Sequence, residues 1–214
     1  MVTARRTFLT QGHYQPLIEA VLSCINSLQI SSLVDLGCGE GTYTNRIAQA
    51  GIQVIGIDLS KAALKRAAKA ACATYVIANL TQTPLLDRSV DAALSIFSPF
   101  DAQEVLRISK RWFIVVRPQT DHLDELKAIL YASVRPNPEP SVNLLGFTHY
   151  SRTDVRFSMD LDHEALNALL DMTPYVHTSP QAGIQRCRAL THLHVRASFV
   201  VDVFESCIPS SIKL

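Results

Sequence analysis

Three glycines at alternate positions mark the stretch whose residue types could do chemistry. They lie in residues 35–41 (Asp-Leu-Gly-Cys-Gly-Glu-Gly), directly after a short apolar run. Glycine adopts left-handed backbone angles at little cost, and without a side chain it lets a ligand lie close against the backbone. The spacing differs from the Gly-x-Gly-x-x-Gly of dinucleotide-binding loops. An ordinary glycine-rich turn is the alternative interpretation.

An acidic residue, Asp58, follows the next apolar run at a distance of roughly 20 residues, the spacing at which an acid accepts hydrogen bonds from ribose hydroxyls. Leu59 would then flank an adenine ring. Asn79, after a third apolar run, is a candidate partner of the adenine amine. The alternatives are structural: Asp58 as a carboxylate favoured at a helix N-terminus, and Asn79 as the first residue of a turn.

A third segment, residues 96–101 (Ile-Phe-Ser-Pro-Phe-Asp), follows a fourth apolar run. Ligands of open α/β sheets bind outside the carboxyl ends of the strands, so this segment would face the substrate. Asp101 is the one candidate catalytic acid, although capping of the next helix is the stronger interpretation of its position. Phe97 and Phe100 could stack on a base, and core packing explains each of them equally well.

Alternating strand and helix patterns surround these residues and must position them. Helical spacing marks 13–29, 42–50, 61–72 (with Ser60 as N-cap), 101–109, 121–131 and 162–171, and strand patterns mark 32–36, 52–57, 74–78, 90–96, 112–116, 146–161 and 192–204. This alternation predicts a Rossmann-like α/β fold, with a mainly parallel seven-stranded sheet covered by helices on both faces.

We expect one domain over residues 1–214, with a helical N-terminal segment (1–30) and a proline-rich loop (132–145). Three prolines exclude a continuous helix from that loop, which we interpret as a flexible loop or lid. The last two strands, 146–161 and 192–204, could form an antiparallel edge.

Composition and charge narrow the class of protein. Hydrophobic residues make up 48% and charged residues 18% of the chain, which is enough apolar material for a sizeable core. The net charge of +1 argues against a generally basic nucleic-acid binder. The five cysteines include no CxxC pair, so we expect no metal site and reduced thiols in a cytoplasmic protein. We expect no signal peptide and no membrane span.

The glycine motif resembles the first motif of class I methyltransferases, in which this loop holds the amino-acid end of S-adenosyl-L-methionine (SAM). A narrower resemblance, over about 4–175, is to the 23S rRNA (guanine-N1-)-methyltransferases. It rests on segments 4–9 (Ala-Arg-Arg-Thr-Phe-Leu) and 12–17 (Gly-His-Tyr-Gln-Pro-Leu), with further similarity at 37–41, 58–61, 99, 122–127, 146–148 and 172–174. The resemblance implies methyl transfer to N1 of a guanine in an RNA hairpin loop.

The resemblance also implies cofactor contacts. Tyr14 would close over SAM, Glu40 and Gly41 would lie along it, and His122 would approach its methionine end. Core packing of Tyr14 and a solvated His122 are the alternatives. The full set expected to bind the cofactor is Tyr14, Asp35, Gly37, Gly39, Glu40, Gly41, Thr42, Asp58, Leu59, Asn79 and His122.

Two departures from the family concern the RNA more than the cofactor. Members begin with a four-ligand zinc module that helps to hold RNA, and this sequence begins where that module would end. We expect either a piece of a longer protein or a natural protein without the module. The family's Lys-Pro-Gly-Gly turn is replaced by residues 109–112 (Ser-Lys-Arg-Trp).

Basic side chains are candidate phosphate contacts, although a solvated surface charge explains each one taken singly: Arg5, Arg6, Lys110, Arg111, Arg135 and Arg152. Three functions therefore stay open. They are rRNA guanine-N1 methylation, methylation of a small molecule with 132–145 as a lid, and SAM binding without catalysis. The sequence does not predict an oligomeric state.

Overall fold

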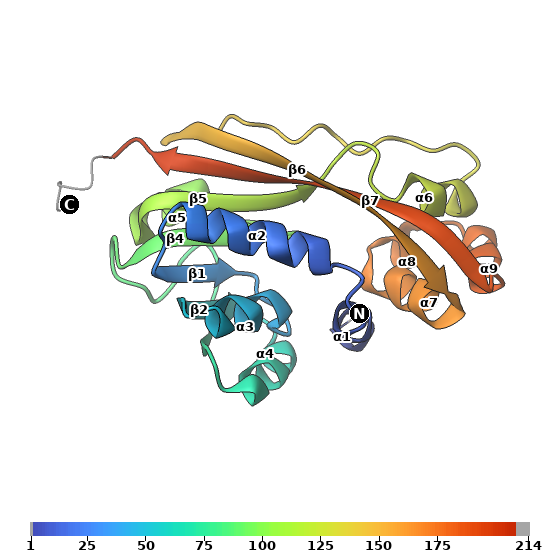
Figure 1. Cartoon of the computed structure of the whole chain (residues 1–214), viewed down its shortest axis with the longest axis horizontal. Coiled ribbons are helices and arrows are strands. Elements are labelled where there is room, and N and C mark those ends of the chain that lie inside the picture. Colours follow the sequence, from blue (N-terminus) through green and yellow to red (C-terminus); the bar gives the residue numbers. More distant parts are fainter. Residues whose placement is uncertain (1, 209–214) are drawn as a thin grey trace. The chain divides into compact units, whose positions relative to one another are not determined.

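The computed structural model describes residues 2–208, with side chains from residue 4 onward. Its strands form one seven-stranded sheet in the order β3-β2-β1-β4-β5-β7-β6. The pairs β1–β2, β1–β4, β2–β3 and β4–β5 are parallel. Figure 1 shows β6 and β7 running in opposite directions, so the expected antiparallel edge is confirmed. The predicted mainly parallel, seven-stranded fold is confirmed as well.

The strands are β1 Ser32–Leu36, β2 Gln53–Asp58, β3 Thr74–Ile77, β4 Val90–Ile96, β5 Ser109–Pro118, β6 Phe147–Asp162 and β7 His192–Ser206. Strands β1 and β4 are almost wholly buried, as expected of central strands covered on both faces. Strand β5 begins earlier than predicted. Helix α5 passes directly into it at Ser109, whose hydroxyl donates to the Val105 carbonyl. This direct connection occupies the place of the family's glycine turn.

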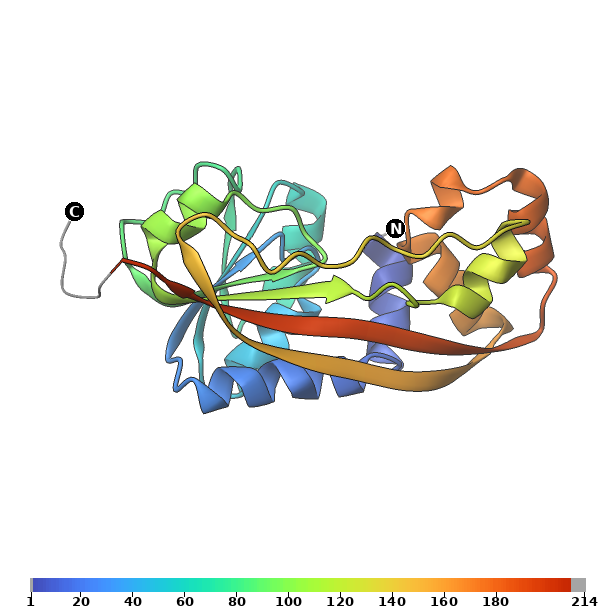
Figure 2. The ribbon, with the colours of Figure 1, turned by 90° about the horizontal axis from the view of Figure 1, so that it is seen from above.

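The α-helices are α1 Val2–Thr10, α2 Gln15–Ser27, α3 Thr42–Gln49, α4 Lys61–Ala67, α5 Ala102–Ile108, α6 Asp124–Leu130, α7 His163–Met172, α8 Tyr175–Thr178 and α9 Gln181–Arg188. Ser60 accepts a hydrogen bond from the Ala63 amide, which confirms it as an N-cap. Helix α4 is shorter than predicted, because the chain tightens into a 3₁₀ turn and reaches a left-handed conformation at Ala71. Figure 2 shows α2 and α5 on opposite sides of the strands.

The chain divides into two compact units. The sheet unit contains residues 18–117, 140–153 and those from 200 onward, and it holds the strands β1 to β4 and most of β5. The helical unit contains the chain up to residue 17 together with 118–139 and 154–199. The expectation of a single domain stays a prediction. Within residues 2–208, no helix is long and apolar enough to cross a bilayer.

A buried carboxylate, Asp202 on β7, organises one edge of the sheet unit. It is fully buried and accepts hydrogen bonds from Arg117, His149 and Arg152, at 2.6 to 3.0 Å. The two arginines also reach the proline-rich loop, where they donate to the carbonyls of Ser141 and Pro140. The loop is irregular, as predicted, and this cluster anchors it. Arg152 is therefore bound to a carboxylate of its own chain, and its expected contact with a phosphate stays a prediction.

Candidate active site at the carboxyl ends of the strands

The three segments singled out in the sequence meet at one edge of the sheet unit. Leu36 at the end of β1 pairs with Ile57 on β2 and with Ser95 on β4, so the segments that follow these strands leave the sheet side by side. The strand order reverses at β1, with β2 on one side and β4 on the other. A reversal of this kind opens the crevice in which doubly wound sheets bind their ligands.

Each glycine of the loop has a different reason to lack a side chain, and all three have positive φ angles of 58 to 81°. A Cβ on Gly37 would lie 1.9 Å from the Ser98 hydroxyl, so the segment after β4 packs directly on the loop. A Cβ on Gly41 would lie 2.6 Å from the side chains of Ala67 and Tyr75. At Gly39 a Cβ would meet no described atom within 4 Å. The open face of the loop is therefore at Gly39.

Asp58 joins the end of β2 to this loop. One carboxylate oxygen accepts from the Gly39 amide at 2.8 Å and the other from the Ser60 amide at 2.7 Å. The second bond is the helix-start interaction considered as the alternative. A carboxylate offers about four lone-pair positions, so two of them stay available to ribose hydroxyls. Asp58 therefore shapes the loop and can still bind a ligand.

Buried polar groups hold the loop from behind. Asp35 is buried and accepts from the Thr44 hydroxyl at 2.6 Å, which ties the end of β1 to α3. Glu40 is also buried and accepts from the Thr42 hydroxyl at 2.7 Å. Burial raises the pKa of the Cys38 thiol, with the nearby carboxylates of Asp35 and Asp58 adding to the shift, so this thiol stays protonated. These contacts keep the loop in shape before any ligand arrives.

The expected adenine contacts lie at the same edge. Leu59 is 66% exposed, so its side chain is available as a surface for ring stacking. Asn79 follows β3, and its side-chain oxygen accepts from the Thr81 amide at 3.1 Å, which confirms the turn considered as its alternative. That oxygen retains a second lone pair for an amine. The roles of Leu59 and Asn79 in binding stay predictions.

The two aromatic residues of the segment after β4 have different environments. Phe100 packs edge-on against Phe113, with ring centroids 4.7 Å apart, so core packing is its role. Phe97 is 37% exposed and has a φ angle of 57°, a strained conformation for a phenylalanine. Asp101 caps α5, since one of its oxygens accepts from the Glu104 amide at 2.9 Å. The capping interpretation of Asp101 is confirmed, and its catalytic role stays a prediction.

Tyr14 and His122 belong to the helical unit. Tyr14 is buried and contacts the rings of Phe8, Phe157 and Phe199 edge-on, as the core-packing alternative predicts. His122 is buried too, so the solvated alternative is wrong. Burial, with the charge of Lys127, lowers the pKa of His122 to about 3, and its Nδ1 accepts from the Ser198 amide. The glycine loop belongs to the sheet unit, and the cofactor contacts of Tyr14 and His122 stay predictions.

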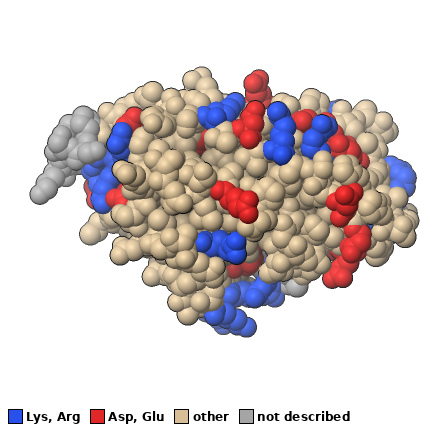
Figure 3. Space-filling model, viewed as in Figure 1, with Lys and Arg blue, Asp and Glu red and all other residues tan. Residues whose placement is uncertain are grey.

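Two of the other basic candidates, Lys110 and Arg111, are paired with acidic side chains on the surface. Lys110 pairs with Asp91 and Arg111 pairs with Glu205. On the face drawn in Figure 3, basic and acidic side chains are interspersed outside the grey residues. This mixed surface agrees with the small net charge and favours local contacts with an anionic partner over a broad basic field.

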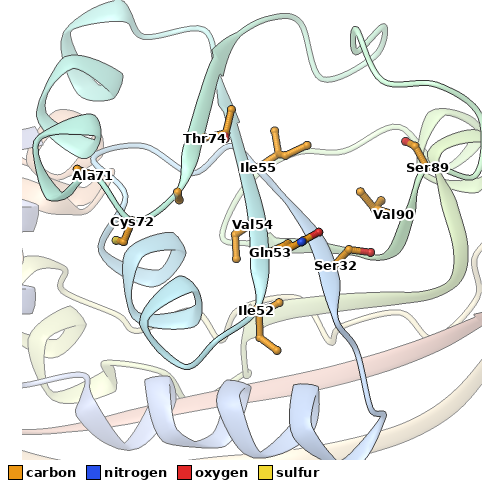
Figure 4. A pocket seen from close by; sticks show the side chains of 11 residues that line it. Ser32, Ile52, Gln53, Val54, Ile55, Ala71, Cys72, Thr74, Ser89 and Val90 are labelled. Atoms are coloured by element: carbon orange, nitrogen blue, oxygen red, sulfur yellow. The ribbon is translucent and has the colours of Figure 1, made fainter.

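A pocket of about 580 Å³ lies at the opposite ends of the same strands (Figure 4). It is lined by the first residues of β1, β2, β3 and β4, including Ser32, Gln53, Thr74 and Val90. Ligands of this fold bind at the carboxyl ends of the strands. We therefore assign the candidate site to the glycine loop and give this pocket no part in it.

An adenosyl ligand fits the arrangement at the glycine loop. Gly39 leaves an open face, Asp58 keeps lone pairs for two hydroxyls, and Leu59 presents an exposed apolar surface. Among the described residues, no side chain caps the N-terminus of α3, so its first amides stay available to a ligand carboxylate. The sequence singles out the segment that contains Ser98 but does not predict its contact with Gly37, because this contact joins segments far apart in the chain.

Comparison with known proteins agrees with this geometry. The model of the family described as "Methyltransferase domain" matches residues 33–119. The chain is 33% identical over 209 residues to YxjB of Bacillus subtilis (strain 168), provisionally named a 23S rRNA (guanine-N(1)-)-methyltransferase, and the match covers 90% of this chain and 73% of that one. It is 32% identical to the 23S rRNA (guanine(748)-N(1))-methyltransferase of Streptomyces fradiae, with 91% and 75% covered.

The fold has a counterpart among solved structures. A crystal structure of a provisionally assigned methyltransferase from Bacillus halodurans C-125 superposes with a TM-score of 0.55 at 14% identity, covering 86% of this chain and 97% of that one. Fold and site together define a class I methyltransferase that uses SAM as its cofactor. At the level of sequence, the chain belongs to the 23S rRNA (guanine-N1-)-methyltransferase family.

Proposed function

We propose that this protein transfers the methyl group of SAM to N1 of an unpaired guanine in a hairpin loop of 23S rRNA. The observation that carries the proposal is the similarity of about 90% of the chain to relatives named for this reaction. N1 lies on the Watson–Crick edge of the base, so the target must be unpaired or splayed out. Because this substrate is ribosomal RNA, we propose that the protein acts in the cytoplasm.

The residues of the site support alignment of cofactor and base. When bound, SAM supplies an activated sulfonium methyl group, so positioning is the main task left to the protein. Asp58 would hold the ribose and the open face at Gly39 would accept the amino-acid end. Phe97, exposed and strained after β4, is the residue we assign to stacking on the target guanine.

Removal of the N1 proton needs a base, and we assign this role to Asp101. Its Oδ1 is used by the cap of α5, and among the described residues its Oδ2 has no donor. The other acid on α5, Glu104, is buried and accepts from Thr83 and Arg107 through both of its oxygens. Those bonds leave Glu104 saturated, so Asp101 is the acid of this helix that can take a proton.

Two substitutions separate capping from catalysis at Asp101. Asparagine caps helices as well as aspartate, so Asp101→Asn should leave the thermal midpoint unchanged while methyl transfer falls about 100-fold. Asp101→Ala should lose the cap as well, at about 1 kcal/mol of stability. Single-turnover methylation and thermal unfolding measure the two effects. Full activity in Asp101→Asn would leave this residue a cap and nothing more.

Methyl transfer itself is tested with labelled SAM and unmethylated 23S rRNA. We expect label on one guanine of a hairpin loop, located by primer-extension arrest, since methylation at N1 blocks base pairing. A protein that binds SAM but transfers no label to rRNA contradicts the proposed substrate. Label recovered in a small molecule of a cell extract would then support the second candidate, a small-molecule methyltransferase.

A further inference from the structure

A second pocket, of about 490 Å³, lies wholly within the helical unit. Its walls come from the end of α6, the segment that follows it, and the start of α8. The volume is in the range of small-molecule sites. None of its lining residues belongs to the glycine loop or to the segments that meet there. The pocket is therefore a separate feature that needs its own explanation.

Two tyrosines form the aromatic part of the pocket. The rings of Tyr131 and Tyr175 stand nearly perpendicular, at 84°, with centroids 6.4 Å apart. The Tyr131 hydroxyl accepts a hydrogen bond from Ser179 at 2.8 Å, which fixes the ring. Burial raises the pKa of Tyr175 to about 12, so its hydroxyl is a neutral donor. Rings held in this way offer π-faces on which a nucleobase can stack.

Cationic and amide groups complete the lining. The guanidinium of Arg135 is exposed and has no acidic partner within residues 2–208. Lys127 is almost fully buried, and one of its three N–H groups is taken by Asp124 at 3.0 Å. Asn137 donates its amide to the Gln119 carbonyl, which leaves its side-chain oxygen as an acceptor. The pocket thus combines stacking surfaces, positive charge and an amide oxygen.

We propose that this pocket binds one unpaired nucleotide of the RNA substrate, with its base against Tyr131 and Tyr175 and its phosphate at Arg135. The inference rests on the proposed function and adds a second point of contact with the RNA. Stacking on aromatic side chains beside cations is how proteins hold single-stranded RNA without a fixed sequence. Two motifs of the resemblance adjoin the pocket in the sequence: residues 122–127 end at Lys127, which lines it, and residues 172–174 directly precede Tyr175.

The test compares three variants of the full chain: Arg135→Ala, Tyr175→Leu and, as a control, Lys69→Ala. Lys69 is exposed in the 3₁₀ turn after α4, so its loss removes the same charge from the sheet unit. Fluorescence anisotropy measures binding of an adenosine oligoribonucleotide of about six residues and of unmethylated 23S rRNA, and calorimetry measures SAM binding.

We expect Tyr175→Leu to weaken binding of both RNAs about 10-fold. Arg135→Ala should weaken it and lower the slope of log Kd against log salt by about 0.7, the value for one phosphate contact on a single strand. SAM affinity and the Lys69→Ala control should match the wild type. Arg135 is exposed, so this variant should fold even where the tyrosine variant does not.

The outcomes distinguish the failure of the proposed pocket from the failure of the proposed methylation substrate. Binding of the oligoribonucleotide that depends on Arg135 and Tyr175 supports the pocket, even where 23S rRNA takes up no label. Methylation of 23S rRNA by both variants at the wild-type rate and affinity overturns the pocket and leaves the proposed function standing. A wild type that binds neither RNA overturns both.

Discussion

Replacing Asp202 with alanine is expected to lower the free energy of unfolding by about 3 kcal/mol, at the lower end of the effect of breaking a buried ion pair. The carboxylate is fully buried and shared by Arg117, Arg152 and His149, whose side chains are 23 to 29% exposed. Without it, two guanidinium groups would face each other with no counter-charge. Urea unfolding followed by tryptophan fluorescence and circular dichroism measures the change.

The matched control is Asp160, a carboxylate that is exposed where Asp202 is buried. Asp160 lies on β6 and pairs with His194 and His192, but 70% of its side chain is exposed. Asp160→Ala should leave the urea midpoint unchanged, because an exposed pair contributes little. An Asp202→Ala midpoint equal to that of Asp160→Ala would mean that the cluster adds nothing to stability.

The same carboxylate predicts a dependence on pH. Burial alone would raise the pKa of Asp202, but hydrogen bonds from Arg152, Arg117 and His149 outweigh it and hold the pKa below its usual value. A lowered pKa in the folded protein gives stability that is present above the pKa of the unfolded chain, about 3.9, and is lost as the pH falls below it. The urea midpoint of Asp202→Asn should therefore fall less steeply on acidification below about pH 4 than that of the wild type.

The sequence predicts most of the fold, because its buried strands are short apolar runs with clear ends. The predicted bounds of β1 and β4 match the structure, β2 is shifted by one residue at both ends, and β3 ends one residue earlier than predicted. The sequence pattern does not predict helices α8 and α9. Each follows a proline, and α9 contains Gly183, which reads as a break in a helix. The structure shows why this glycine is there: a Cβ would lie 2.1 Å from the Leu130 carbonyl.

The residues of the candidate site differ in the same way in whether the sequence predicts them. The glycine loop could be predicted because one contiguous strand–turn–helix segment carries its signal, and Asp58 follows at a fixed spacing. The cluster at Asp202 could not be predicted, because its three partners come from β5 and β6. A lone acid inside the apolar run of β7 is the only indication of a buried carboxylate that the sequence offers there. Tyr131 and Tyr175 meet only through tertiary packing.

Substituting Gly39 with arginine is expected to weaken SAM binding at least 100-fold, or about 2.7 kcal/mol, while the protein stays folded. A Cβ at this position would meet no described atom within 4 Å, so the arginine side chain would start from the open face of the loop. Its direct cost to folding is the left-handed backbone, about 1–2 kcal/mol. Calorimetric titration with SAM measures the affinity, and methyl transfer should disappear with it.

Gly51 provides a control with the same added charge, also at a glycine with a positive φ angle. It has a φ angle of 92°, also meets no described atom within 4 Å of a Cβ, and lies just beyond the C-terminal end of α3, opposite the glycine loop. Gly51→Arg should therefore lose similar stability and bind SAM as the wild type does. Gly37→Ala should behave differently again, since its methyl group would collide with Ser98 and destabilise the loop itself. If Gly39→Arg and Gly51→Arg bind SAM equally well, the cofactor does not lie on this loop. The added charge and the positive φ angle are common to the two variants, and the open face at Gly39 is what distinguishes them.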